Sequence, residues 1–322
     1  MAPLWGFFLQ ILSREVGYYS RNTGARRRKA TGVPALNPLV SIVVLTRDKL
    51  AYTRRCLESF LLSADRPVEI VVVDNGSSDG TPDWLEGFRA QAVRARVGVR
   101  LQLNSGNSGC STARNQGLGL CRGEIVAFLD NDTELRQRSW IARLLRALEE
   151  TGAAVAGPKL LYPWAPHPIQ CAGVVVTLGG RPVFLGRGES LDDPRFAARR
   201  EVPALISACW LARRRALLEA GGFDEAFNPV QFEDFDLCYR LRGRGARVVY
   251  EPCAEVYHHE STTTAGTPRL PNTYLVVKNG LLFKQRWRAM YSSEGGPPEA
   301  AARWRDIPPC ALAELPAPPI LP

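Results

Sequence analysis

Two aspartates separated by a single residue, Asp130 and Asp132, end an apolar run in the stretch "VAFLDNDTEL" (126–135). Carboxylates this close repel each other, so a positive group is expected between them. Paired carboxylates suit a hard divalent cation, Mg²⁺ or Mn²⁺, that keeps open positions for the phosphates of a substrate. The pair therefore predicts a metal ion that presents positive charge to a diphosphate.

A second acidic cluster lies in "GGFDEAFNPVQFEDFDLCYRLRGRG" (221–245), where a helix is expected from about Glu233 to Arg242. Glu233 and Asp234 stand at its start, where a carboxylate can project into a cleft and act as a general base. Asp236 follows in the first turn, where the helix dipole stabilises an acid without any catalytic role.

The sequence has three histidines, and two of them, His258 and His259, are adjacent after the strand-like run "ARVVYEPCAEVY". Imidazole nitrogen is a common metal ligand. Neighbouring side chains of a strand point to opposite faces, so only one of the two is expected to reach the ion.

Apolar strands alternate with amphipathic helices in front of these motifs, which predicts a mainly parallel sheet covered by helices on both faces. The helix after the second strand is expected to have Thr81 as its N-cap and Pro82 at its first position. The expected elements are strands 39–45, 68–74, 99–103 and 124–130 and helices 49–64, from about 82, 111–121 and 139–150.

Ligands of such sheets bind beyond the carboxyl ends of the strands. All four ends carry small, polar or acidic residues, in "TRD" (46–48), "DNGSSDG" (74–80), "NSGNSG" (104–109) and "DND" (130–132). A carboxylate such as Asp74 could accept hydrogen bonds from a ribose hydroxyl or a base N–H. The first strand–helix turn lacks GxGxxG and "NSGNSG" lacks the Walker lysine, which disfavours NAD-type and P-loop sites.

Composition is that of an ordinary globular protein, with 322 residues, 45% hydrophobic and 23% charged. The net charge of +9 suits an anionic partner. The eight cysteines include no CxxC pair, so reduced thiols in a cytoplasmic protein are expected rather than a disulfide framework or a structural zinc site.

Both ends of the chain differ from its centre. Residues 1–37 begin with an apolar segment, about half the ~20 residues of a membrane span, which could lie on a membrane or, as an equal alternative, pack against the body or an oligomer partner. The basic linker that follows is expected to be solvated surface, with contact to anionic lipid as the lesser alternative. Residues 263–322 are expected to form a helical segment and a Pro/Ala-rich tail, poorly ordered from about Ser292.

The central region, residues 38–262, resembles the inverting glycosyltransferases of family 2. The motifs that carry the resemblance occur in order: "VSIVVLTRD", "EIVVVDNGSSDGT", "ARNQGL", "GEIVAFLDNDTEL", "GGFDEAF…FEDFDLCYRLR" and "VYHHEST". The resemblance implies the GT-A fold, a Rossmann-like nucleotide-binding sheet with an acceptor-side subregion. It extends to bacterial rhamnosyltransferase-like enzymes of surface polysaccharide synthesis.

The resemblance also implies roles for the acidic motifs. Asp234, with Glu233 beside it, corresponds to the catalytic base, and Asp130, Asp132 and His258 correspond to the ligands of Mg²⁺ or Mn²⁺.

Contact with the nucleotide sugar is implied for residues at strand ends and in "ARN": Thr46, Asp48, Asp74, Asn75, Arg114, Asp130 and Asn131. Of these, Asp74 corresponds to the contact with the base or ribose and Arg114 to a phosphate contact. Trp210 lies near the usual acceptor-side segment, and a role as a core aromatic is an equal alternative.

The expected activity is a metal-dependent, inverting transfer of a sugar from a UDP- or dTDP-sugar to a hydroxyl of a glycan or lipid-linked acceptor, in cell-surface polysaccharide synthesis. The expected location is the cytoplasm, with peripheral attachment to the inner face of the cell membrane as an alternative. A nucleotidylyltransferase is disfavoured because "TRDKLAYTRR" has no glycine to form a triphosphate loop. A non-catalytic nucleotide-sugar-binding protein stays an alternative, whereas nucleic acid is not expected because basic and aromatic residues do not interleave.

Overall fold

The structure is a computed structural model. It describes residues 38–62, 67–260, 262, 272–317 and 320–322. The apolar segment and basic linker of residues 1–37 lie outside the described residues. The predicted domain boundaries fall beside undescribed residues and stay predictions.

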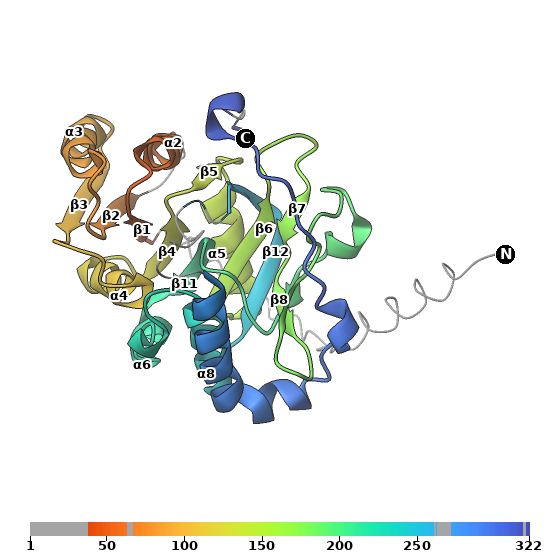
Figure 1. The fold of residues 1–322 in the computed structure, drawn as a ribbon. Coiled ribbons are helices and arrows are strands. Elements are labelled where there is room, and N and C mark those ends of the chain that lie inside the picture. Colours follow the sequence, from red (N-terminus) through yellow and green to blue (C-terminus); the bar gives the residue numbers. More distant parts are fainter. Residues whose placement is uncertain (1–37, 63–66, 261, 263–271, 318–319) are drawn as a thin grey trace, which may run out of the picture.

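The first half of the chain forms four parallel strands in the order β3-β2-β1-β4. Figure 1 shows helices α2 and α3 on one side of these strands and α4 on the other. The strands are β1 (Val40–Thr46), β2 (Val68–Asp74), β3 (Gly98–Leu103) and β4 (Ile125–Asp130), and the helices are α2 (Leu50–Leu61), α3 (Thr81–Arg94) and α4 (Cys110–Leu120). Each expected element is present within a few residues of its predicted bounds.

The second half extends the same sheet in the order β4-β11-β6-β12-β10. Strand β11 runs antiparallel to both of its neighbours, and β12 runs parallel to β6. The longer elements are α5 (Trp140–Thr151), β6 (Val155–Leu161), β11 (Cys209–Arg213), α6 (Arg214–Glu219), α7 (Glu233–Gly243), β12 (Val248–His258) and α8 (Asn272–Ser293). The sheet is therefore mixed rather than wholly parallel.

Short elements complete this half. Strands β5, β7 and β10 pair at the sheet's margin with β12 or β6, and β8 and β9 form a separate hairpin. Their bounds are β5 (Thr133–Leu135), β7 (Ile169–Cys171), β8 (Val174–Val176), β9 (Pro182–Phe184) and β10 (Arg200–Glu201), with 3-10 turns at Pro194–Phe196, Glu225–Phe227, Glu299–Ala301 and Leu312–Glu314.

The start of α3 differs by one residue from the prediction. Thr81 is the first helical residue, and Gly80, with φ of 87°, occupies the N-cap position. The Thr81 hydroxyl donates instead to the Asp79 carboxylate over 2.6 Å. A left-handed conformation at this position suits glycine, which has no Cβ to collide with the backbone.

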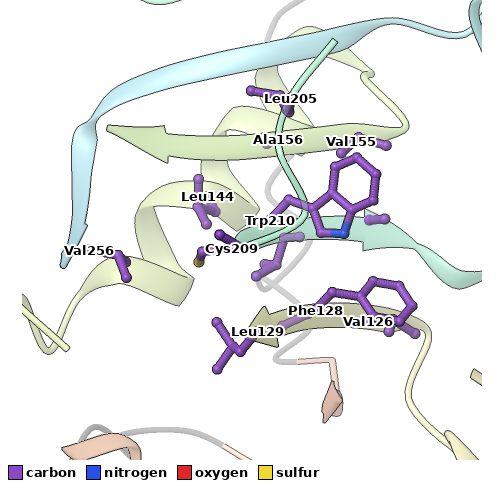
Figure 2. Packing of buried hydrophobic residues seen from close by; sticks show 14 of the residues in the cluster. Val126, Phe128, Leu129, Leu144, Val155, Ala156, Leu205, Cys209, Trp210 and Val256 are labelled. Carbon is purple, nitrogen blue, oxygen red and sulfur yellow. The ribbon is translucent and has the colours of Figure 1, made fainter. Parts of the chain in front are cut away.

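Trp210 belongs to the hydrophobic core, so the acceptor-side role considered for it is wrong. Its side chain is fully buried on β11 and lies with Phe128 of β4 and Val155 of β6 in the cluster of buried residues that Figure 2 shows. Its ring meets that of Phe128 at a centroid distance of 6.4 Å. The predicted core thiols are also confirmed for the buried cysteines: Cys56, Cys121, Cys171, Cys209 and Cys238.

The C-terminal segment, here the described residues 294–317 and 320–322, lies along the surface and ends near β5 (Figure 1). The expectation of poor order is wrong for its described residues, because hydrogen bonds hold them. Arg55 donates to the carbonyls of Leu315 and Pro316 over 3.1 and 3.2 Å, and the Leu321 N–H donates to the Arg136 carbonyl over 2.7 Å. Within the described part of the chain, no helix has the length and hydropathy needed to cross a membrane.

Candidate active site

The two aspartates of the opening motif meet His258 at the edge where β4 ends. Asp130 is the last residue of β4. The chain then turns into β5, whose Thr133 pairs with His258 of β12. As a result the His258 Nε2 lies 3.2 Å from the Asp132 Oδ1. One ligand atom from each of Asp130, Asp132 and His258 lies within 4.8 Å of the others, a spacing that can hold one metal ion.

The two histidines point to different partners, as their places on a strand predict. His258 Nδ1 lies 2.6 Å from the Gln170 Oε1, which orients its other ring nitrogen toward Asp132. His259 Nε2 instead lies 2.7 Å from the Glu134 Oε1. The structure thus brings His258, and not His259, into the group with the two aspartates.

Opposite charges set the protonation of this group. Burial works to raise the pKa of Asp132, but His258 and the Thr262 hydroxyl outweigh it and lower that pKa to about 2. Burial likewise works to lower the pKa of His258, and Asp132 overrides it and raises that pKa. Asp132 is therefore ionised at neutral pH, as a metal ligand must be.

The second acidic pair, Glu233 and Asp234, begins α7, as predicted. Asp234 is buried and accepts hydrogen bonds from the backbone N–H groups of Ser207, at 3.0 Å, and Phe235, at 2.8 Å. Burial, followed by the charge of Glu233, raises the pKa of Asp234 to about 7. A carboxylate with a pKa near 7 is suited to taking a proton at neutral pH.

Arg114 of α4 joins the two acidic groups. Its Nη1 lies 2.6 Å from the Glu233 Oε1, and its Nη2 lies 2.8 Å from the Asp130 Oδ1. Burial works to lower the pKa of Arg114, but Asp130 and Glu233 outweigh it and raise that pKa. The guanidinium therefore stays charged and engages two carboxylates of the chain itself, whereas a phosphate contact was expected.

Three of the residues expected to contact the nucleotide hold the loops after β1, β2 and β3. The Asp74 carboxylate accepts from the Ser77 N–H over 3.0 Å, and the Asp48 carboxylate accepts from the Ser78 N–H over 2.7 Å. The Asn75 Oδ1 accepts from the Ser108 N–H over 2.9 Å. These side chains therefore fix the shape of the strand-end loops.

Thr46 and Asn131 take part in a buried hydrogen-bond group between β1 and the DxD turn. The Asn131 amide donates to Thr46 Oγ1 over 3.2 Å and to Thr53 Oγ1 over 3.0 Å. These bonds fix the backbone on which Asp130 and Asp132 stand.

A cavity of about 740 Å³ brings most of the predicted residues together. Its lining includes Asn75, Arg114, Asp130, Asn131, Asp132, Glu233, Asp234 and His258. Thr46, Asp48 and Asp74 are not part of this lining as the described residues form it. Thr46 and Asp74 are the last residues of β1 and β2, and Asp48 follows β1.

The cavity is also lined by residues that the sequence analysis missed. Arg47 and Asn107 follow strand ends, so the same strand-end rule could have found them. Phe232 directly precedes the acidic pair in the chain, and the Ser207 N–H donates a hydrogen bond to Asp234. Trp304 comes from the C-terminal segment, where no local pattern points to the site.

Comparison with known proteins shows which family the chain resembles. The family model "Glycosyl transferase family 2" matches residues 41–166. An N-acetylglucosaminyl-diphospho-decaprenol L-rhamnosyltransferase of Mycobacterium tuberculosis is 30% identical over 257 residues, which cover 72% of this chain and 80% of that protein. A pre-mycofactocin glycosyltransferase of the same species is 32% identical over 69% of this chain.

The chain spans less than half of some of its relatives. It matches 43% of the pre-mycofactocin glycosyltransferase. It matches 28% of an uncharacterised Sinorhizobium fredii protein that is 35% identical over 78% of this chain.

Solved structures share the fold at low identity. GalNAc-T7 with UDP, GalNAc and Mn²⁺ aligns with a TM-score of 0.64 and 16% identity, over 80% of this chain and 49% of its own. A mannosyltransferase from Pyrobaculum calidifontis, in complex with GDP-Man and Mn²⁺, aligns with a TM-score of 0.55 and 16% identity, over 92% and 82%.

The mixed sheet, with its polar and acidic strand ends gathered at one edge, is that of the GT-A glycosyltransferases. The predicted fold class is therefore confirmed. The chain belongs to glycosyltransferase family 2.

Proposed function

We propose that the chain is an inverting, metal-dependent glycosyltransferase that moves a sugar from a nucleoside-diphosphate donor to an acceptor hydroxyl. One observation supports this above the others. A single cavity is lined both by the Asp130–Asp132–His258 group and by the Glu233–Asp234 pair. A metal-binding group that can carry the charge of the diphosphate, beside a buried base, is what transfer from a sugar diphosphate requires.

The residues fit a bound cation. Asp130, Asp132 and His258 would hold Mg²⁺ or Mn²⁺, because two carboxylates and an imidazole form a hard, anionic ligand set. When bound, the ion supplies positive charge that offsets the charge of the leaving diphosphate. Mn²⁺ also appears with two structures of the same fold.

The chain's own residues would carry the proton and position the reactants. Asp234 takes the proton of the acceptor hydroxyl, and the acceptor oxygen bonds to the anomeric carbon. The bond from that carbon to the diphosphate oxygen breaks, and the nucleoside diphosphate leaves with the electron pair. One displacement inverts the anomeric configuration, while Arg114 keeps Asp130 and Glu233 from repelling each other.

The finer specificity is likewise a proposal, and the names of two relatives support its acceptor. We propose a UDP- or dTDP-sugar donor, with its nucleoside near Asp74 and Asn75. The named rhamnosyltransferase acts on a decaprenol-linked sugar, and another relative is an O-antigen biosynthesis protein of Myxococcus xanthus. A glycan or lipid-linked acceptor of cell-surface polysaccharide synthesis, used at the cytoplasmic face of the membrane, is the corresponding proposal.

Thermal unfolding tests the donor site directly. The chain is melted with UDP, dTDP, GDP, CDP or ADP, each with Mn²⁺ and with EDTA. Ligand at about a hundred times its Kd adds about 2.7 kcal/mol to the free energy of unfolding, which raises the melting temperature by several degrees. We expect a rise with UDP or dTDP that EDTA removes.

The matched variants are Asp132→Ala, which should lose the metal-dependent rise, and Asp192→Ala, an exposed aspartate away from the cavity, which should keep it. A rise that persists in Asp132→Ala, or that no nucleotide produces, contradicts the proposal. Turnover of a nucleoside triphosphate with a sugar phosphate would instead identify a nucleotidylyltransferase.

A further inference from the structure

A second cavity, of about 500 Å³, adjoins the candidate active site. The two cavities share three lining residues, Glu260, Thr262 and Trp304. Thr262 is also tied to the metal-binding group, because its hydroxyl donates to the Asp132 Oδ2 over 2.9 Å. The second cavity is therefore a side extension of the site rather than a separate hollow.

Aromatic side chains from distant parts of the chain line this second cavity. They are Tyr52 of α2, Tyr162 and Trp164 after β6, and Trp304 of the C-terminal segment. The rings of Tyr162 and Trp164 lie 4.8 Å apart between centroids, and Trp304 is 57% exposed. Aromatic faces beside a few polar groups are the usual lining of a pocket for a partly apolar ligand.

The charged groups of the second cavity balance one another. Arg187 forms two hydrogen bonds with the Glu260 carboxylate, at 2.7 and 2.8 Å. Lys49 and Asp306 bring one charge of each sign. His259 is paired with Glu134. A balanced lining does not favour a phosphate, whereas it offers donors and acceptors to a neutral ligand rich in hydroxyl groups.

The C-terminal wall of the cavity is fixed in place. The Arg187 guanidinium lies 3.7 Å from the centre of the Trp304 ring, and its Nε donates to the Arg305 carbonyl over 2.9 Å. Trp304 also meets the Phe184 ring edge-on at 5.4 Å. Because Arg187 is held by Glu260, the wall is connected to the strand end that carries His258.

We propose that the second cavity binds a sugar ring of the acceptor, next to the ring that receives the transferred sugar. This inference rests on the proposed function. A pyranose has C–H groups on its faces and hydroxyls at its rim, which matches aromatic walls with balanced polar groups. The acceptor then passes over the rim formed by Glu260, Thr262 and Trp304 to reach Asp234.

Ligand-observed saturation-transfer NMR on the full chain tests this. The probes are methyl α-L-rhamnopyranoside, N-acetylglucosamine, methyl β-D-galactopyranoside and N,N′-diacetylchitobiose, each with and without UDP and Mn²⁺. We expect saturation transfer to at least one probe, unchanged when the nucleotide and metal are present. The donor sugar is the other source of a pyranose, and displacement of the probe by a UDP- or dTDP-sugar would assign the cavity to the donor and overturn the inference.

Two variants and a control test whether the sugar probes bind in the second cavity. Trp304→Ala should weaken probe binding about tenfold or more, as loss of a central aromatic anchor does. Asp306→Ala, an exposed position, should weaken it without unfolding the chain. Leu218→Ala removes a side chain that is 48% exposed on α6, outside both cavities, and should leave binding unchanged.

The sugar pocket would be refuted if no probe bound the wild type, or if Trp304→Ala and Asp306→Ala both bound the probe as well as the wild type does. The metal-dependent melting shift with nucleotide is measured on every variant. If the wild type lacks that shift, the proposed function fails; if all variants keep it and probe binding is insensitive to the substitutions, only this inference fails.

Discussion

Asp234 differs from its neighbour Glu233 in the groups that hold its carboxylate. It is buried at the start of α7, and its carboxylate is held by the N–H groups of Ser207 and Phe235. Its pKa of about 7 lets it exchange a proton at neutral pH. Glu233, one residue earlier, is instead paired with Arg114. Of these two adjacent residues, Asp234 is therefore the candidate base and Glu233 is the ion-pair partner of Arg114.

Replacing Asp234 with asparagine should reduce turnover by about 10²–10⁴-fold, the usual contribution of a general base. Binding of nucleotide with Mn²⁺ should change little, because the metal-binding group is intact. Transfer assays and nucleotide melting shifts, run in parallel, measure the two effects. Equal losses of turnover and nucleotide binding would mean that Asp234 contributes to donor binding rather than to proton transfer.

The raised pKa of Asp234 also predicts a pH trend in stability. Its folded pKa, about 7, exceeds the ordinary aspartate value of 3.8, so its stabilising contribution is complete below about pH 4 and is lost as pH rises toward 7. The asparagine side chain of the Asp234→Asn variant does not titrate. The melting temperature of this variant minus that of the wild type should therefore increase from pH 4 to pH 8. A constant difference would show an ordinary pKa at this position.

Arg114→Gln should destabilise the chain by about 3–5 kcal/mol, because it leaves carboxylates buried without their cation. Arg114 also works to lower the pKa of Asp234, so the acid limb of the activity–pH profile should move to higher pH. Arg215→Gln, which removes an exposed partner of Glu219, is the control and should alter neither. An unmoved profile would limit Arg114 to a structural role.

At the scale of elements, the site depends on how closely α4 approaches the loop before α7. The Cys110 N–H donates to the Pro229 carbonyl over 2.7 Å, and the Ser111 N–H donates to the Asn228 Oδ1 over 3.0 Å. Gly109 permits this contact, because it has φ of 89° and a Cβ there would lie 2.3 Å from that same oxygen.

Gly109→Ala should therefore destabilise the chain by about 1–3 kcal/mol, from backbone strain and the collision with Asn228. It should also weaken nucleotide binding, since Asn107 and Cys110 beside it line the main cavity. Gly119→Ala is the matched control within α4, where a Cβ meets nothing within 4 Å, and it should be neutral or slightly stabilising. Thermal melting compares them, and equal effects would contradict this account.

At the scale of the whole molecule, the net charge of +9 is the property without an assigned partner. The basic stretch "ARRRKA" (25–30) concentrates part of it, and it lies outside the described residues. Juxtaposed basic residues attract anionic lipid by about 1 kcal/mol each near the surface, and salt screens the attraction.

We expect the full chain to co-sediment with vesicles of phosphatidylglycerol and phosphatidylcholine at low salt, and to be released as salt is raised. Replacing Arg26, Arg27, Arg28 and Lys29 by alanine should abolish the binding. The control removes equal charge from exposed positions of the described part: Arg89, Arg94, Arg96 and Arg122. Equal losses in both variants would indicate attraction by net charge alone, without a specific basic segment.

The sequence alone determined the strand–helix order of the first half and the places of the acidic residues at strand and helix ends. It could do so because alternation, apolar periodicity and strand-end chemistry are local properties of a chain. The sequence did not predict the antiparallel strand β11 or the short strand β5, since strand direction within a mixed sheet depends on distant partners.

Only the tertiary structure decided which residues share a site. It paired Arg114 with Asp130 and Glu233, which are separated from it by 16 and 119 positions. It assigned Trp210 to the core and brought Trp304 to the cavity wall. Ion pairs and cavity walls of this kind form only when distant segments pack, so no local pattern in the sequence encodes them.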